Sequence, residues 1–199
     1  VFGLGNDAYL SDALGPKVVK KVVVTSHFVA KDNEFVKVSC FVPGVMAVTG
    51  LESSEMVKSL VKEFHIDIVI VVDSLATRDI NRLYKTYQIT DTGINPGSGI
   101  NNHRLALNKK TLNVPVIAIG VATVVDSASL IINTLEEVDK NFIQKLDISK
   151  LYNTLYRNDS SFILTSKEID SLIDIIASNI GEAINYALNP SFSNNDKVR

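Results

Sequence analysis

The stretch Ile66-Asp67-Ile68-Val69-Ile70-Val71-Val72-Asp73 decides the fold class of this chain. Its apolar run is short, rich in β-branched residues and almost continuous, which is typical of a parallel strand buried on both faces. The run predicts a central strand that ends at Val72. Asp73 would then stand at the carboxyl edge of the sheet, where open α/β folds place their ligand crevices.

Short apolar runs alternate with amphipathic segments on both sides of this strand, through residues 1–135. Further strands are expected at residues 36–42, 114–121, 22–25 and 86–90. Alternating strands and helices are typical of parallel sheets, so the pattern predicts an α/β fold. We expect a three-layer, mostly parallel sheet flanked by helices, of the phosphorylase/hydrolase-like kind.

Three segments carry apolar residues at helical spacing. They predict a helix that begins at Ser53 with a serine cap, a second that begins near Asp126, and a long amphipathic C-terminal helix from Ile169. We expect residues 1–190 to form a single α/β domain and residues 191–199 to form a polar tail.

The composition excludes several classes of protein. With 199 residues, 46% of them hydrophobic, the chain can bury the core of one compact domain. A net charge of −2 provides no basic field for nucleic acid, and no apolar run is long enough to span a membrane. The single cysteine, Cys40, excludes a disulfide framework and is expected to be a small buried side chain. Because the first residue is Val1 and not a start methionine, we also expect that residues have been removed from the N-terminus.

Two aspartates follow predicted strands, and each has a functional and a structural interpretation. Asp73 is either a site residue or the cap of the turn at 74–79, and Asp126 is either a site residue or the N-cap of the next helix. If the two carboxylates converge on one crevice, they cannot both ionise comfortably, and one keeps a proton near neutral pH. Such a pair can hydrolyse an amide, since the ionised partner activates water while the neutral partner polarises the carbonyl.

The densest group of Gly, Asn and Pro residues lies in Asp-Thr-Gly-Ile-Asn-Pro-Gly-Ser-Gly-Ile-Asn-Asn-His at 91–103, which predicts a loop. The loop is either a plain turn or a segment that offers backbone N–H groups to a substrate carbonyl. Its candidate substrate-positioning residues are Asp91, Thr92, Gly93, Asn95, Gly97, Ser98 and Gly99.

Other polar residues are candidates for the same crevice. Asp12 follows the first glycine-rich turn and either caps a helix from Ala13 or faces Asp73. The three histidines show no metal-binding spacing, so any metal site must be assembled from distant positions. The further candidates for the crevice are Asn6, Arg78 and His103.

Six motifs in this order resemble the germination protease family of spore-forming bacteria, and the resemblance resumes at residues 164–170. The motifs are Gly3-Leu4-Gly5-Asn6, Asp12-Ala13-Leu14-Gly15-Pro16, Pro43-Gly44-Val45-Met46 with Thr49-Gly50-Leu51-Glu52-Ser53-Ser54-Glu55, Asp73-Ser74-Leu75-Ala76-Thr77-Arg78, Asp91-Thr92-Gly93-Ile94-Asn95-Pro96-Gly97-Ser98-Gly99 and Gly120-Val121-Ala122-Thr123-Val124-Val125-Asp126. The sequence departs from the family pattern at Ser74 and Thr77, where alanines are common, and at Ala122, which replaces a proline.

The resemblance implies an endopeptidase that degrades small acid-soluble spore proteins in the cytoplasm of the spore core. It further implies a zymogen, a homo-oligomer and an atypical aspartic peptidase without a cofactor, whose catalytic aspartates match Asp73 and Asp126. Two alternatives stay open. One is a metal-assisted peptidase using Asp12, Asp73 and His103, as in the related hydrogenase maturation peptidases, and the other is a non-catalytic relative that binds a spore protein.

Overall fold

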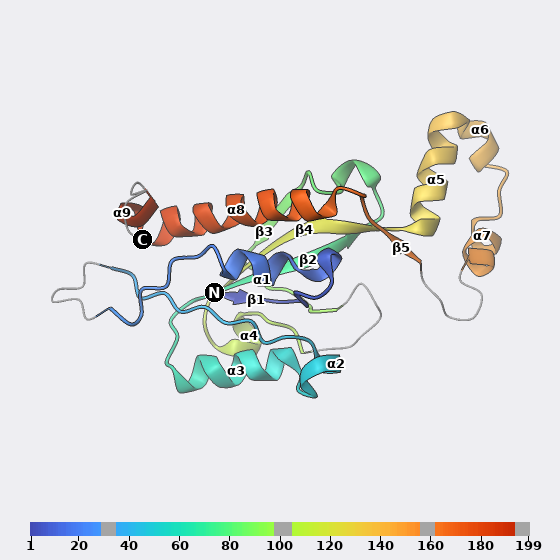
Figure 1. Ribbon diagram of the computed structural model, residues 1–199. Coiled ribbons are helices and arrows are strands. Elements are labelled where there is room, and N and C mark those ends of the chain that lie inside the picture. The colour runs from blue at the N-terminus through green and yellow to red at the C-terminus, as the bar shows by residue number, and fades with distance from the viewer. Residues whose placement is uncertain (29–34, 98–104, 156–161, 194–199) are drawn as a thin grey trace.

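A computed structural model describes residues 1–28, 35–97, 105–155 and 162–193, and Figure 1 shows its layers. The strands of these residues form one sheet in the order β1-β2-β4-β3, with β5 also paired to β4. The predicted α/β class is confirmed, since a mostly parallel sheet is flanked by helices. The parallel strands are β1 (Phe2–Gly3), β2 (Val69–Thr77) and β4 (Val116–Asp126), and the antiparallel strands are β3 (Tyr87–Thr90) and β5 (Ile163–Leu164).

The central strand runs further than the sequence predicts. β2 continues to Thr77 because its polar end keeps pairing with the long strand β4, with one register shift after Leu75. Asp73 therefore lies in the middle of β2, opposite Gly120, and its predicted position after the strand is wrong. β1 pairs with β2 only as far as Val72, so Asp73 is still the first residue of β2 beyond the end of β1.

Two of the predicted strands do not form. Residues 22–25 are not a strand, because the Thr25 hydroxyl bonds to the backbone of Val36 and Val38. The buried strand predicted at 36–42 is also wrong, since only Phe41 makes a bridge to β1. This segment lies at the outer edge of the sheet, where Val42 is 37% exposed. The strand predicted at 86–90 is confirmed as β3.

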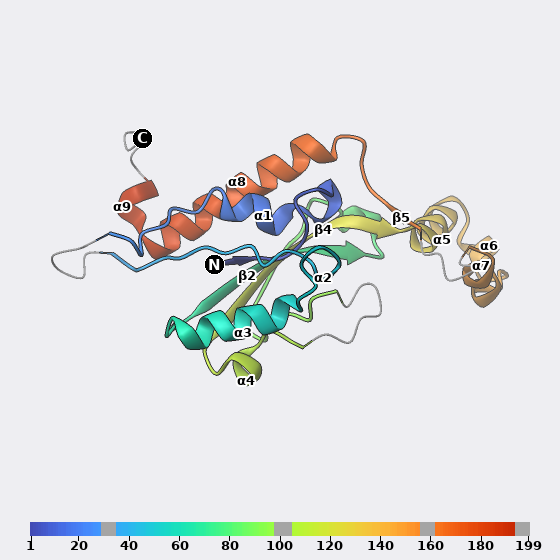
Figure 2. The same cartoon turned by 60° about the horizontal axis from the view of Figure 1, so that its bottom comes forward.

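Helices α1 (Leu14–Val19) and α8 (Ile169–Leu188) cover one face of the sheet, as Figures 1 and 2 show. Lys17 of α1 also pairs with Asp174 of α8 at 2.7 Å, and this hydrogen bond lowers the pKa of the Asp174 carboxyl. The core on this side contains Leu14, Val18, Ile173, Ile176, Ala177 and Ile180 together with Ile70, Val72 and Val121 of the strands.

The opposite face is covered by α3 (Ser53–Glu63) and α4 (Lys109–Leu112). The predicted helix at Ser53 is confirmed, but its serine cap is wrong, because Glu52 is the N-cap residue and makes no side-chain cap bond. The core on this side contains Phe2, Leu4, Val57, Val61, Val69, Val71, Leu107, Leu112 and Val116.

The remaining elements surround these layers. The helices α5 (Ser127–Val138), α6 (Lys140–Ile143) and α7 (Ile148–Leu155) extend beyond the end of β4, away from the sheet layers, as Figures 1 and 2 show. The short elements are η1 (Leu10–Asp12), α2 (Met46–Thr49), η2 (Ile80–Arg82) and α9 (Pro190–Ser193). Within the described ranges, no helix combines the length and the apolarity needed to cross a membrane.

Replacing Ile173 by alanine is expected to lower the free energy of unfolding by about 3 kcal/mol, because it opens a cavity under α8. The side chain of Ile173 is fully buried in the core between α8 and the sheet. Ile175→Ala is the matched control on the same helix, since Ile175 is 58% exposed, and its expected loss is below about 0.5 kcal/mol. Urea denaturation followed by circular dichroism measures both, and equal losses would contradict this assignment of the core.

Candidate active site

Asp73 is a buried carboxylate on the α3 side of the sheet. Successive side chains of a strand point to opposite faces, and Val69 and Val71 lie in the core under α3, so Asp73 faces the same side. Only 8% of Asp73 is exposed. The N–H of Ser74 donates to Asp73 Oδ1 at 2.9 Å.

α3 packs on the face of the sheet toward which Asp73 points. α3 begins beside α2 near the carboxyl ends of the strands and runs back along β2 (Figure 2). Val61 and Val57 pack in the same core as Val69 and Val71, and Ser54 lies one turn further toward the N-terminus of α3.

Ser54 is a further candidate for the site, and it was not among the residues predicted from the sequence. Its side chain is fully buried, and in the part of the chain that the structure describes its hydroxyl has no hydrogen-bond partner. The neighbouring Ser53 hydroxyl instead donates to the carbonyl of Gly44 at 2.8 Å. Helical spacing could have identified Ser54, since it lies on the same side of the helix as Val57 and Val61 and is therefore predicted to face the sheet.

The loop after β1 brings Asp12 to the same edge of the sheet. The N–H of Leu4 donates to the Val72 carbonyl at 2.8 Å, which holds the start of this loop beside β2. Gly5 has a φ of 110°, and a Cβ there would lie only 2.0 Å from the Asp12 carbonyl oxygen and 3.0 Å from Asp12 Oδ1. Asn6 uses its side-chain oxygen within the loop, where it accepts from the N–H of Ala8. Asp12 therefore belongs to the edge at which Asp73 lies, as one of the predicted alternatives requires.

The glycine-rich loop begins on the α3 and α4 side of the sheet. Ile94 forms a backbone bridge to Leu107, which is buried in the core under α3. Gly93 has a φ of 90° and passes so close to Leu107 that a Cβ would lie 2.2 Å from its carbonyl oxygen. Residues 91–97 form the predicted loop, and these include Asp91, Thr92, Gly93, Asn95 and Gly97. The other candidates on this segment, Ser98, Gly99 and His103, lie outside the described residues.

The structure does not bring Asp126 to Asp73. The register pairs Asp73 with Gly120 and Thr77 with Val125, so Asp126 lies about five residues, or about 16 Å, further along the strands. Asp126 is instead the N-cap of α5, as one sequence interpretation predicts, and its Oδ2 accepts from the N–H and the hydroxyl of Ser129, each at 2.8 Å. The two carboxylates therefore cannot share a proton in this conformation.

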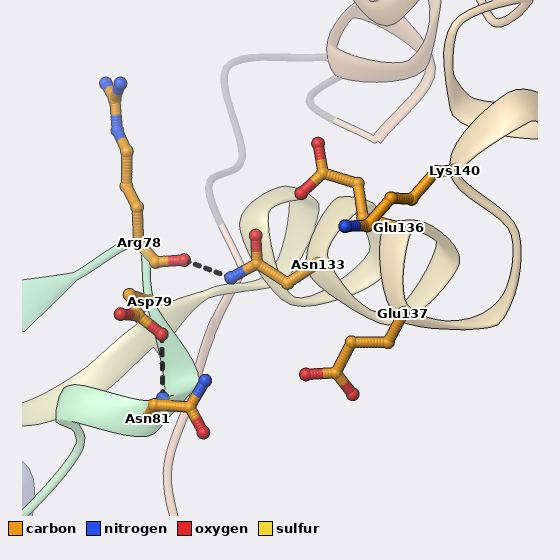
Figure 3. Close-up of a pocket in the computed structure, with 7 residues that line it drawn as sticks. All are labelled: Arg78, Asp79, Asn81, Asn133, Glu136, Glu137 and Lys140. Carbon is orange, nitrogen blue, oxygen red and sulfur yellow. Dashed lines mark hydrogen bonds between the residues drawn. The ribbon is translucent and has the colours of Figure 1, made fainter.

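Arg78 lines a separate pocket at the base of α5 rather than the surroundings of Asp73 (Figure 3). Its carbonyl accepts from the Asn133 side chain at 2.7 Å, while its guanidinium points away from Asn133 in Figure 3. Asp79 accepts from the N–H of Asn81 at 2.9 Å. This open pocket has a volume of about 440 Å³ and is lined by Arg78, Asp79, Asn81, Asn133, Glu136, Glu137 and Lys140.

The other reactive side chains do not form a second centre in the described ranges. No three of the His, Cys, Asp and Glu side chains there lie close enough to hold a metal ion. Burial raises the pKa of the Cys40 thiol, which disfavours the nucleophilic thiolate, although Cys40 is only partly buried rather than the fully buried side chain that was predicted. Among the candidates in these ranges, Asp73 combines burial with a place just beyond the end of β1.

These features define an α/β protein with a buried aspartate, its candidate active-site carboxylate, on an inner parallel strand. The family model of the germination protease matches residues 1–162, and this chain belongs to that family.

Three relatives, each named germination protease, illustrate the similarity. The chain is 38% identical to the protein of Clostridium perfringens over 213 residues, which cover 96% of this chain and 66% of that one. It is 49% identical to the protein of Oceanobacillus iheyensis over 147 residues, covering 71% and 40%, and 33% identical to that of Bacillus subtilis over 249 residues, covering 99% and 68%. The chain therefore spans about two thirds of the length of most of the curated relatives that it matches.

The cap at Asp126 leads to a stability prediction. Asp126→Ala is expected to lower the free energy of unfolding by about 1 kcal/mol, because the N–H of Ser129 loses its acceptor, whereas Asp126→Asn keeps a good cap and changes little. Hydrogen exchange of the α5 amides, together with urea denaturation, measures the loss. Equal destabilisation by the two substitutions would contradict the capping role.

Proposed function

We propose that this chain is the catalytic part of an endopeptidase that hydrolyses small acid-soluble spore proteins during germination. Membership of the germination protease family supports a peptidase of the spore. The observation that carries the proposal is Asp73, a buried carboxylate of β2 that lies just beyond the end of the neighbouring strand β1. Open α/β sheets bind their ligands outside the carboxyl ends of their strands, and β1 is the strand that ends beside Asp73.

Asp73 acts as the general base in this proposal. A carboxylate at this position can take a proton from water as the water attacks the scissile carbonyl. The loop at residues 91–97 starts on the same side of the sheet and is the proposed element that positions the substrate. This is an aspartic-type reaction, in which a carboxylate activates water and the enzyme forms no covalent intermediate.

Asp126 is proposed as a second carboxylate that hydrolysis requires. Because the register separates it from Asp73, its participation requires the junction of β4 and α5 to move toward Asp73 in the working enzyme. Such a movement would have to break the pairing of Val125 with Thr77 and Leu164 and the hydrogen bond from the N–H of Ser127 to the Phe162 carbonyl. Asp126→Asn separates this role from capping, since it keeps the cap and removes the carboxylate.

A metal-assisted peptidase is the second candidate, and the position of Asp12 at the Asp73 edge favours it. Carboxylate oxygens are suitable ligands for a divalent metal. The described residues do not complete a three-residue site, however, and His103 lies outside them. We therefore assign no step of the reaction to a metal.

The remaining parts of the proposal follow from the family. We propose that the enzyme works in the cytoplasm of the spore core, forms a homo-oligomer and is made as an inactive zymogen. No contact with nucleic acid is proposed, because the substrate is the protein and the chain carries a net charge of −2.

Cleavage of a purified small acid-soluble spore protein, followed by mass spectrometry in metal-free buffer, tests the proposed function. A few defined fragments, formed equally with and without a chelator, are the expected result. Loss of cleavage with the chelator and its return with a divalent metal would favour the metal-assisted candidate. Tight binding without cleavage in either buffer would contradict the peptidase and favour a non-catalytic relative.

A further inference from the structure

Beyond Val38, whose carbonyl accepts from the N–H groups of Thr25 and Ser26, the outer edge of the sheet beside β1 is open for hydrogen bonding at Cys40 and Val42. The N–H of Phe41 donates to the Val1 carbonyl, and the Phe41 carbonyl accepts from Gly3, each at 3.0 Å. Alternate residues of an extended chain direct their N–H and C=O groups to opposite sides, so Cys40 and Val42 direct theirs away from β1. Among the described residues, no hydrogen-bond partner faces these groups. The edge can therefore accept another extended chain.

A groove of about 370 Å³ lies between this edge and the flank of α3. The ring of Phe41 forms one wall and is held edge-on against Phe2, with ring centroids 6.3 Å apart. Leu51 is 56% exposed, so the groove offers apolar surface that the chain itself does not cover. The groove is lined by Phe41, Leu51, Glu52, Glu55, Met56, Ser59 and Leu60.

The groove combines this apolar surface with acidic groups. Glu52 and Glu55 belong to its lining, and that lining contains no Lys, Arg or His. A cationic side chain beside the groove is therefore attracted, and an anionic one is repelled. The complementary ligand is a chain with a large apolar side chain and a basic one.

We propose that the edge at Cys40 and Val42 and the adjoining groove bind an extended segment of the protein substrate by strand addition. This inference rests on the proposed peptidase function. The substrate backbone pairs with the open edge, and its alternate side chains fall on the α3 side, as in other cases of β-augmentation. The groove takes a large apolar side chain, and the side chain two positions away is a Lys or Arg that lies against Glu55.

The register relates this binding site to the proposed catalytic carboxylate. Phe41 is level with Phe2, which is level with Val71, so the edge reaches the level of Asp73 at its carboxyl end. An added strand lies three strand spacings from β2, or about 14 Å, which about four extended residues span. The groove therefore recognises residues about four positions away from the bond to be cleaved.

Fluorescence anisotropy with three labelled synthetic peptides tests the inference. One peptide is Ser- and Thr-rich and contains Phe-Ser-Lys, the second has Glu in place of that Lys, and the third has Ser in place of that Phe. The Phe-Ser-Lys peptide is expected to bind about tenfold more tightly than either of the others. Equal binding of the three peptides would overturn the inference, while cleavage of the spore protein would continue to support the proposed function.

Two substitutions assign the binding to the groove. Glu55→Lys is expected to reverse the preference between the Lys and Glu peptides, whereas Glu63→Lys, at the far end of the same helix, leaves it unchanged. Leu51→Ser changes an exposed side chain. It is expected to weaken the binding of the Phe-Ser-Lys peptide about threefold and to leave the affinity for the peptide that lacks Phe unchanged. An unchanged preference in Glu55→Lys, or unchanged affinity in Leu51→Ser, would place the peptides elsewhere and overturn the assignment.

Discussion

Replacing Asp73 by asparagine is expected to lower kcat/KM for a small acid-soluble spore protein at least about 1000-fold, the range of a lost general base. The amide has the size of the carboxylate but cannot take a proton from water. The fold should persist, because the asparagine oxygen can still accept from the N–H of Ser74, which donates to Asp73 Oδ1 at 2.9 Å. A fluorogenic assay with a peptide from the cleaved region measures the rate.

Asp79→Asn is the matched control for this substitution. Asp79 is an exposed aspartate that bonds within its own turn, and its replacement is expected to change kcat/KM less than about twofold. Circular dichroism and urea denaturation must show native folds for both variants. A natively folded Asp73→Asn variant with near-normal activity would remove Asp73 from the mechanism.

Replacing Gly15 by alanine is expected to lower the free energy of unfolding by more than about 3 kcal/mol. A Cβ at this position of α1 would lie 2.3 Å from the Leu4 carbonyl oxygen and 2.6 Å from that of Val72. Both are backbone atoms, so α1 has to move away from β1 and β2. The gain in helix propensity, about 1 kcal/mol, is too small to offset this clash.

Gly50→Ala distinguishes a steric clash from an unfavourable backbone conformation. Gly50 has a φ of 71°, but nothing lies within 4 Å of a Cβ built there. Its replacement is expected to lower the free energy of unfolding by about 1 kcal/mol, which is the strain of a left-handed conformation alone. Thermal denaturation compares the two variants, and a Gly15→Ala protein as stable as Gly50→Ala would show that α1 is not held at this distance.

The central part of the fold could be predicted because its signals are local. The β-branched run before Asp73 predicts a buried strand, and the apolar spacing after Ser53 predicts the helix that covers it. The extent of β2 could not be predicted, since residues up to Thr77 stay in the strand only through pairing with β4. Residues 36–42 have the composition of a core strand but lie at the edge, and composition does not reveal the order of strands.

The arrangement of the candidate site also depends on strand pairing that the local sequence does not reveal. The sequence places Asp73 and Asp126 after similar apolar runs, and this similarity suggests that the two meet. Their separation follows from the register of β2 and β4 and from the 11-residue length of β4, which no local pattern encodes. The place of Ser54 on the sheet-facing side of α3 was predictable from helical spacing, whereas the approach of Asp12 to Gly5 depends on how the first loop folds back.

The most direct test of the central claim, that Asp73 acts in the chemical step, is the single-turnover rate of cleavage with enzyme in excess over a bound peptide substrate. Binding by the Asp73→Asn variant, followed by anisotropy, should match that of the unchanged protein, while its single-turnover rate constant falls at least about 1000-fold. A single-turnover rate within about tenfold of the unchanged protein, or a loss of activity caused entirely by weaker binding, would contradict the claim.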